Sequence, residues 1–383
     1  MSEWPTVKLG EVAEQTNHRV GELDVPIYSV TKYDGFVPSS EYFKKRVFSM
    51  DIRKYKLCTA GDFAYATIHL DEGSIGISPV KCGISPMYTT FRLNSLNISP
   101  DYLLRYLKSS RALTQYLTLG SGSAERRKSI KFTDLRKMEI PFPPLGEQNR
   151  IVGILGKTTG AISSVQKQIE QAKKLRSSIV GMASKMAVEL RAISEYFDIN
   201  PQQPRNIPDN APTSFVPMAN LDETFGISPI TSRFSEHKKG YTYFENGDIL
   251  LAKITPCFEN GKSAIAKLST QIGHGSTEFH VLRHKNHMHQ DVCLSPLLVA
   301  AILKQPSFLK PAENFMRGSA GQKRIPVSYI ASLKVPVLKS VDLEKIDQSL
   351  EIVEALLNLY HRKLSLLQEL QKSLATRAFA GLL

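Results

Sequence analysis

The stretch "MEIPFPPLGEQNRIVGIL", Met138–Leu155, decides the fold. Its apolar, strand-like start runs into Pro143 and Pro144, which cannot lie inside a helix, and a helical apolar pattern begins directly after them. A second stretch, "KVPVLKSVDLEKIDQSLEIV" (Lys334–Val353), makes much the same transition. The sequence therefore predicts a globular block followed by a long helix, twice along one chain.

An internal repeat of about half the chain explains why the transition recurs. The segment "AGDFAYATIH" (Ala60–His69) is echoed by "NGDILLAKIT" (Asn246–Thr255), and in both a Gly-Asp turn precedes an apolar strand. The segment "GSAERRKSIKFTDLRKMEIPFP" (Gly122–Pro143) is echoed by "GSAGQKRIPVSYIASLKVPVL" (Gly318–Leu338). We interpret the chain as a duplicated unit of one domain and one helix.

Each copy mixes short strands with modest helices. A short amphipathic stretch opens each copy, at Val7–Gln15 and at Glu189–Phe197, and a segment of helical periodicity follows at Ser99–Leu117 and Leu294–Leu309. The predicted fold class is therefore α+β, with a pseudo-twofold internal repeat. The predicted parts are a first block over residues 1–145, a helix over 146–187, a second block over 188–338 and a C-terminal helix over 339–383.

Both helices carry apolar residues at alternating steps of three and four, which is typical of a coiled-coil seam. Each helix would span about 60 Å at 1.5 Å per residue. The seam has three possible partners: the helix's own block, a second chain, or the other helix. We favour an antiparallel pair within the chain, which would hold the two blocks at opposite ends. The predicted seam residues are Ile151, Leu155, Ile162, Val165, Ile169, Ile346, Leu350, Val353, Leu357, Tyr360, Leu364 and Leu367.

The composition of the 383 residues is that of an ordinary globular protein, with 42% hydrophobic and 22% charged residues. No apolar run approaches the roughly 18 residues of a membrane helix, and the N-terminus has no signal-peptide core, so we expect a cytoplasmic protein without a membrane partner. The four cysteines are scattered and are expected to be reduced thiols. The net charge of +13 favours a polyanionic partner such as nucleic acid.

Motifs of catalysis are missing from the sequence: there is no GxGxxG, no P-loop and no GxSxG. A loose nuclease pattern, PD…ExK, can be drawn through Pro208, Asp209, Glu236 and Lys238, but the first copy has no counterpart. A zinc site is suggested by His284, His287, His289 and Cys293, yet these residues lack the paired turns of such sites and do not recur in the first copy. We therefore expect neither a catalytic residue nor a metal site.

Clusters that combine Lys and Arg with Tyr, Asn, Gln or His are suited to the phosphates and base edges of DNA. A solvated surface explains any single cluster equally well, and a recurring cluster can instead serve a recurring protein contact. The candidate DNA-binding residues are Lys32, Tyr33, Lys44, Lys45, Arg46, Arg126, Arg127, Lys128, Lys238, Lys239, Lys253, Asn260, Lys262, Gln322, Lys323 and Arg324.

The alternation of block, long helix, block and long helix resembles the specificity subunit of type I restriction–modification systems, over essentially the whole chain. Three segments carry the resemblance: Ile140–Leu155, with the typical Pro-Leu-x-Glu-Gln-x-x-Ile, Gly318–Pro336, and Leu366–Leu383. The start of the second helix keeps only part of the first pattern, and the first Gly-Ser segment has Arg in place of the typical Gln.

The resemblance implies two target-recognition domains that each read one half of a split, asymmetric DNA site. The helices would set the unread gap and dock two methyltransferase subunits that methylate adenine, and two motor-nuclease subunits would complete the complex. The resemblance further implies that this chain is not an enzyme and holds no cofactor, because S-adenosylmethionine, ATP and magnesium would bind the partner subunits. The alternatives are a stand-alone site-specific endonuclease and a DNA-binding regulator without partners.

Overall fold

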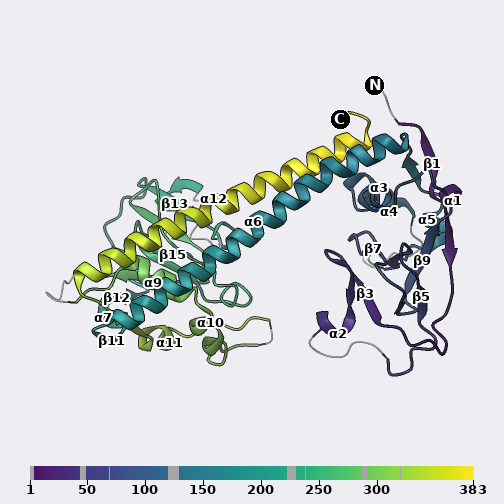
Figure 1. Ribbon diagram of the computed structural model, residues 1–383. Coiled ribbons are helices and arrows are strands. Elements are labelled where there is room, and N and C mark those ends of the chain that lie inside the picture. The colour runs from purple at the N-terminus through teal and green to yellow at the C-terminus, as the bar shows by residue number, and fades with distance from the viewer. Residues whose placement is uncertain are drawn as a thin grey trace. The chain divides into compact units, whose positions relative to one another are not determined.

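The computed structural model describes residues 4–43, 49–68, 70–119, 129–221, 230–237, 239–285, 292–319 and 321–383. The chain forms two compact units, Met1–Ser163 with Leu366–Leu383, and Ser164–Ser365. The division falls inside the two long helices α6 (Leu145–Met186) and α12 (Ser340–Phe379), because each part of a helix packs on elements of its own unit (Figure 1). The division into two blocks and two helices, with boundaries at the helix ends, stays a prediction about functional modules.

The described residues of the first unit form three sheets. β1 (Thr6–Lys8) pairs antiparallel with β10 (Glu139–Pro141), so the first and last strands of the block lie together. One four-stranded sheet has the order β2 (Ala13–Thr16), β9 (Tyr88–Leu93), β6 (Phe63–Ala66), β7 (Ile75–Ile77). The other has the order β4 (Gly35–Pro38), β3 (Ile27–Thr31), β8 (Cys82–Ile84), β5 (Lys56–Cys58), with β3 and β8 parallel. The helices of the block are α1 (Leu9–Val12), α2 (Ser39–Tyr42), α3 (Pro100–Leu107), α4 (Ser110–Leu119) and α5 (Phe132–Leu135).

The second unit repeats this topology strand for strand. β11 (Glu189–Ala192) pairs with β20 (Lys334–Val337). The four-stranded sheets have the orders β12 (Phe197–Ile199), β19 (Phe279–His284), β16 (Ile249–Ala252), β17 (Ser263–Ile265), and β14 (Ile230–Arg233), β13 (Pro212–Val216), β18 (Ile272–Gly275), β15 (Thr242–Glu245). The helical segments are α7 (Ile193–Tyr196), η1 (Met218–Asn220), α8 (Phe234–His237), α9 (Pro296–Leu303), α10 (Pro306–Glu313) and α11 (Val327–Ser332). The predicted α+β fold with an internal repeat is confirmed.

The repeated Gly-Asp pair explains one of the echoes seen in the sequence. Gly61 and Gly247 adopt positive φ angles of 90° and 95°, which favour glycine. The buried Asp62 carboxylate accepts a hydrogen bond from the Nε of Arg92 at 2.6 Å, and the buried Asp248 carboxylate accepts one from Arg283 at 2.7 Å. The motif therefore ends each turn in a carboxylate that anchors the next strand of the sheet.

The helices α3 and α9 occupy equivalent places and begin in the same way. Ser99 and Ser295 precede them, and each hydroxyl accepts a hydrogen bond from a backbone N–H of the first turn. A proline follows at the first helical position, where its missing N–H costs nothing. The buried face of α3 contributes two tyrosines, Tyr102 and Tyr106, to the core of the first unit.

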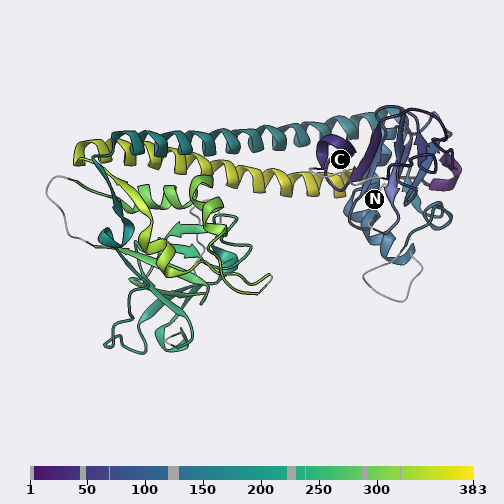
Figure 2. The same cartoon turned by 90° about the horizontal axis from the view of Figure 1, so that it is seen from below.

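The long helices pair antiparallel inside each unit (Figure 1; Figure 2). In the first unit Phe379 near the end of α12 packs on the rings of Tyr102 and Tyr106, with centroids 5.6 and 5.2 Å away. The side chains of Gln371 and Thr159 hydrogen-bond at 2.8 Å there, and in the second unit Arg176 forms an ion pair with Glu354 at 3.4 Å. Each of the two contacts therefore joins α6 to α12 within a single unit.

Burial along this pair follows the apolar pattern of the sequence. Eight of the predicted seam residues are buried, and the other four, Ile162, Tyr360, Leu364 and Leu367, are half-buried. The pairing within the chain agrees with the favoured alternative, and the helices also pack on the blocks. Among the helices that the structure describes, none has both the length and the apolar character needed to cross a membrane. The buried residues are Ile151, Leu155, Val165, Ile169, Ile346, Leu350, Val353 and Leu357.

Candidate nucleic-acid interface

Part of the predicted DNA-binding set falls on residues outside the structural description. Of the first block only Lys32 and Tyr33 can be placed, and both side chains are exposed in the turn between β3 and β4. The Lys32 ammonium lies 5.5 Å from the centre of the Tyr33 ring, which is a cation–π contact. The residues outside the description are Lys44, Lys45, Arg46, Arg126, Arg127, Lys128 and Lys238.

A cavity of about 550 Å³ brings Lys32 together with cations that sequence analysis did not single out. Its lining includes Arg105 and Lys108 from the end of α3 and Lys372 from α12, and Asp101 is the one acidic residue among the lining residues. We call the cavity with Lys32, Arg105, Lys108 and Lys372 the basic cleft. No local pattern identifies these residues, because they come from three elements that meet only in the fold.

Lys108 is the most enclosed ammonium group of this cleft. Its side chain is half-buried, and its Nζ donates a hydrogen bond to the Lys32 carbonyl oxygen at 3.3 Å. Burial lowers the pKa of the Lys108 ammonium, and the nearby Asp34 carboxylate opposes this shift. The Lys108 ammonium is therefore partly desolvated at the wall of the cleft, where Asp101 of α3 is the one carboxylate among the lining residues.

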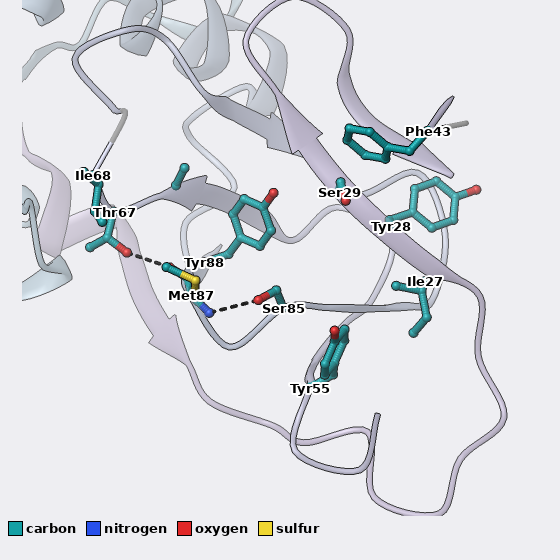
Figure 3. A pocket seen from close by; sticks show the side chains of 11 residues that line it. Ile27, Tyr28, Ser29, Phe43, Tyr55, Thr67, Ile68, Ser85, Met87 and Tyr88 are labelled. Atoms are coloured by element: carbon teal, nitrogen blue, oxygen red, sulfur yellow. Dashed lines mark hydrogen bonds between the residues drawn. The ribbon is translucent and has the colours of Figure 1, made fainter. Parts of the chain in front are cut away.

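A second cavity, of about 370 Å³, lies between β3 and the segments that follow β6 and β8. Figure 3 shows the rings of Tyr28, Tyr55 and Tyr88 around it. The Tyr55 hydroxyl accepts a hydrogen bond from the Ser49 N–H at 3.0 Å, and the Tyr88 hydroxyl accepts one from the Val30 N–H at 3.3 Å. The lining offers largely apolar and aromatic surface, which suits the flat face of a nucleobase or the methyl group of thymine.

In the second unit the structure brings two predicted clusters together. The Ile325 N–H donates to the Lys253 carbonyl oxygen, and the Thr255 N–H donates to the Lys323 carbonyl oxygen, both at 2.9 Å. The loop of Lys253–Lys262 therefore adjoins the loop of Gly321–Arg324. Lys239, Asn260, Gln322 and Lys323 are exposed, and Lys253, Lys262 and Arg324 are half-buried.

Arg324 has an internal partner that sequence analysis did not foresee. Its guanidinium donates two hydrogen bonds to the Glu278 carboxylate, from Nη2 at 2.7 Å and from Nε at 2.9 Å. The guanidinium lowers the pKa of the Glu278 carboxyl group. The buried His280 of β19 donates from Nε2 to the Ile325 carbonyl oxygen at 2.9 Å, so His280 and Glu278, which directly precedes β19, both hold this loop. Arg324 thus positions the loop. The neighbouring Lys323 side chain is exposed and forms no ion pair with another residue that the structure describes, so its ammonium is available to a DNA phosphate.

The zinc pattern of the sequence cannot be assessed as a whole, because His287 and His289 lie outside the described residues. His284 packs its ring edge-on against Phe197, with centroids 5.1 Å apart. Across the part of the chain that the structure describes, no group of three or more His, Cys, Asp or Glu side chains is placed to hold a metal ion.

Comparisons with known proteins agree on one family. Residues 1–174 match the family model of the type I restriction modification DNA specificity domain. The EcoEI specificity subunit of Escherichia coli is 41% identical over 147 residues, which are 38% of this chain and 24% of that protein. The EcoAI specificity subunit of Escherichia coli is 41% identical over 141 residues, which are 36% of this chain and 23% of that protein. The alignments thus span about a quarter of the length of these two relatives.

A more distant relative aligns over nearly the whole chain. The putative MjaX specificity subunit of Methanocaldococcus jannaschii is 22% identical over 98% of this chain and 90% of that protein. Among solved structures, the S subunit from M. genitalium has a TM-score of 0.57 at 14% identity, covering 98% of this chain and 96% of that one. A chain from a study of complex assembly and conformational transition of the type I R-M system has a TM-score of 0.54 at 18% identity, covering 100% and 99%. These two structures share the fold. Together, the sequence matches and the shared fold show that this chain is similar to the specificity subunits of type I restriction–modification systems.

Proposed function

We propose that this chain is the DNA sequence-recognition subunit of a type I restriction–modification complex, and that each α+β block reads one half of a bipartite, asymmetric site. The observation that supports this most is the duplication: the strand order of every sheet in the first unit recurs in the second. The two copies differ in the residues they expose, so two related scaffolds present two different surfaces. Such an arrangement suits a site with two unlike halves.

The energetics of base reading favour two blocks over one. A good contact to a base edge discriminates by about 1–3 kcal/mol, so a block that reads a few base pairs cannot select one site in a genome. Joining two blocks makes the second binding event intramolecular, and only a gap that matches the connection allows both. In this proposal the pair of α6 and α12 sets the length of the unread gap.

The helix pair also supplies a surface for partner proteins. α12 exposes five large apolar side chains, at Val341, Ile352, Leu359, Leu366 and Leu370. Exposed apolar residues along a helix are typical of surfaces that another protein covers. We propose that two adenine methyltransferase subunits dock on the helices and that two motor-nuclease subunits join them. S-adenosylmethionine, ATP and magnesium belong to those subunits, and this chain recognises DNA without catalysing a reaction.

A domain exchange tests the proposal. Replacing residues 1–145 with the corresponding block of another specificity subunit is expected to change one half of the methylated motif and to leave the other half and its adenine unchanged. The readout is sequencing of methylated adenines in cells that carry the complete system. A change in both halves contradicts the division of labour, and cleavage of DNA by the purified chain with magnesium favours the stand-alone nuclease instead.

A further inference from the structure

The basic cleft of the first unit has a counterpart in the second unit, and the two differ in charge. α6 begins at Leu145 and α12 at Ser340, so Thr159 stands at the same position along its helix as Glu354. By the same count Gln371 corresponds to Arg176. The hydrogen bond between Gln371 and Thr159 is therefore the equivalent of the ion pair between Arg176 and Glu354.

The lysine beside each helix pair is equivalent as well. Lys108 directly follows α3, and Lys304 directly follows α9, which are helices of the same length at the same place in the two blocks. Both lysines cap the C-terminus of their helix. Each copy of the fold thus places one lysine next to the equivalent segment of a long helix.

In the second unit the protein provides its own anion at this place. The Glu354 side chain is buried, and its carboxylate pairs with the Arg176 guanidinium at 3.4 Å. Burial raises the pKa of the Glu354 carboxyl group, whereas the charges of Arg176 and Lys304 lower it. Lys304 is buried too, so this carboxylate offsets part of the cost of burying the lysine.

In the first unit the carboxylate is missing and an open space replaces it. Thr159 and Gln371 are uncharged, and both line the basic cleft of about 550 Å³ together with Lys108. Four cationic side chains and one carboxylate, that of Asp101, line this cleft. A concave surface with such an excess of positive charge attracts anions from solution.

We propose that the basic cleft binds a phosphate group, in the place where the second unit has the Glu354 carboxylate, and that in the complex this group is a phosphodiester of the DNA backbone. The assignment to DNA rests on the function proposed above. The turn of Lys32 and Tyr33 forms one wall of the cleft, and Arg105 supplies a guanidinium that can hold two phosphate oxygens. The contact carries no sequence information but fixes how the first block sits on the duplex.

A charge-neutral double variant provides the sharpest test. Thr159→Glu with Gln371→Arg transfers the ion pair of the second unit into the first and leaves the net charge unchanged. Its carboxylate is expected to occupy the cleft and to exclude phosphate. Lys108→Met tests the cleft differently, because it removes the enclosed ammonium and adds no carboxylate. Lys157→Gln, at an exposed position of α6 outside the cleft, is the matched control for the loss of one positive charge.

The first measurement uses inorganic phosphate and requires no DNA. The melting temperature of the full chain is followed against phosphate concentration, with chloride at equal ionic strength as the reference. Wild type and Lys157→Gln are expected to be stabilised by phosphate beyond chloride, and the double variant and Lys108→Met are expected to lose this response. An equal response in all four proteins overturns the phosphate site.

The second measurement uses duplex DNA with the site recognised by the system. The double variant and Lys108→Met are expected to bind about tenfold more weakly at low salt, with a slope of log affinity against log salt that is smaller by about one. Loss of the phosphate response with unchanged DNA affinity overturns the assignment to the DNA backbone. A loss in Lys157→Gln equal to that in Lys108→Met also overturns it, because net charge alone then explains the effect. If wild type itself binds no DNA, the proposed function fails, while the phosphate titration still reports on the cleft.

Discussion

The two units share every sheet order but attach α3 and α9 to the long helices by different residues. In the first unit the buried Gln148 side chain accepts a hydrogen bond from the Ser99 N–H at 2.8 Å and donates to the carbonyl oxygens of Asn97 and Pro143, both at 2.9 Å. In the second unit the equivalent position is the apolar Leu343. The same architecture therefore does not require the same attachment.

The second unit makes its attachment one helical turn later. The Ser295 hydroxyl donates a hydrogen bond to the Asp347 carboxylate at 2.6 Å, and burial raises the pKa of that carboxyl group. The residue in the corresponding place of the first unit is Val152, which packs on the core. This shift explains why the start of the second helix keeps only part of the sequence pattern of the first.

The largest expected effect concerns Phe379, the last residue of α12. The equivalent position of α6 in the second unit is Ser184, which has no aromatic ring. Phe379→Ala is expected to cost about 3–5 kcal/mol of unfolding free energy, since it empties a buried ring site between Tyr102 and Tyr106. Trp4, the single tryptophan, reports on this unit because its Nε1 donates to the Ala378 carbonyl oxygen. Urea denaturation followed by its fluorescence measures the loss. Ser184→Ala, at the equivalent position of α6, is the control and is expected to change little.

A somewhat smaller effect is expected for the attachment itself. Gln148→Ala leaves the Ser99 N–H and two carbonyl groups without their partner, which should cost about 2–3 kcal/mol in the same fluorescence assay. Gln148→Leu combined with Val152→Asp transfers the arrangement of the second unit and is expected to recover part of the loss. If Gln148→Ala unfolds like wild type, the hydrogen bonds of Gln148 do not hold the block to its helix.

A further prediction concerns DNA binding by the loop Gly321–Arg324 of the second unit, in which Lys323 and Arg324 are expected to have different roles. Lys323→Ala is expected to weaken DNA binding by roughly tenfold at low salt and to lower the salt slope by about one, if it meets a phosphate. Arg324→Ala removes the ion pair with Glu278 and is expected to raise the hydrogen exchange of the loop as well. Exchange and DNA affinity are measured for both variants. An equal rise in exchange for the two variants contradicts the positioning role of Arg324.

The smallest expected effect is a pH dependence that only the second attachment has. Because the pKa of the folded Asp347 carboxyl group is raised, its contribution to stability is greatest below the pKa of the unfolded chain and is lost as the pH rises through the folded value. Asp347→Asn should therefore flatten the melting temperature against pH in the acidic range and be least different from wild type at the lowest pH. Gln148, which does not titrate, gives the first unit no such dependence. Identical pH profiles for wild type and Asp347→Asn contradict the raised pKa.

Much of the fold follows from local patterns in the sequence. The Gly-Asp turns, the Ser-Pro helix starts and the apolar steps of three and four each specify an element from neighbouring residues, and they recur in both copies. The internal repeat then supplies the architecture. The basic cleft was not foreseeable in this way, since Lys32, Lys108 and Lys372 are far apart in the chain and each is an ordinary surface lysine in its own segment.

Ion pairs between distant residues set the same limit. Arg324 follows from the sequence as a DNA-binding candidate because basic clusters are visible locally. Its partner Glu278 lies on another part of the chain, and the backbone of Lys253, which hydrogen-bonds to both Glu278 and Ile325, brings the two segments together. Charge patterns therefore locate basic loops in the sequence, while the fold determines which of their cations remain available.

The pairing of β1 with β10, and of β11 with β20, has a consequence for how such proteins diversify. Each pair closes its block at the base, where the first strand meets the last one before the long helix. The rest of each block lies, in the sequence, between the two strands of this stem. Recombination at the stem can then exchange everything above it in one event, while the ends that meet the helix stay where they were.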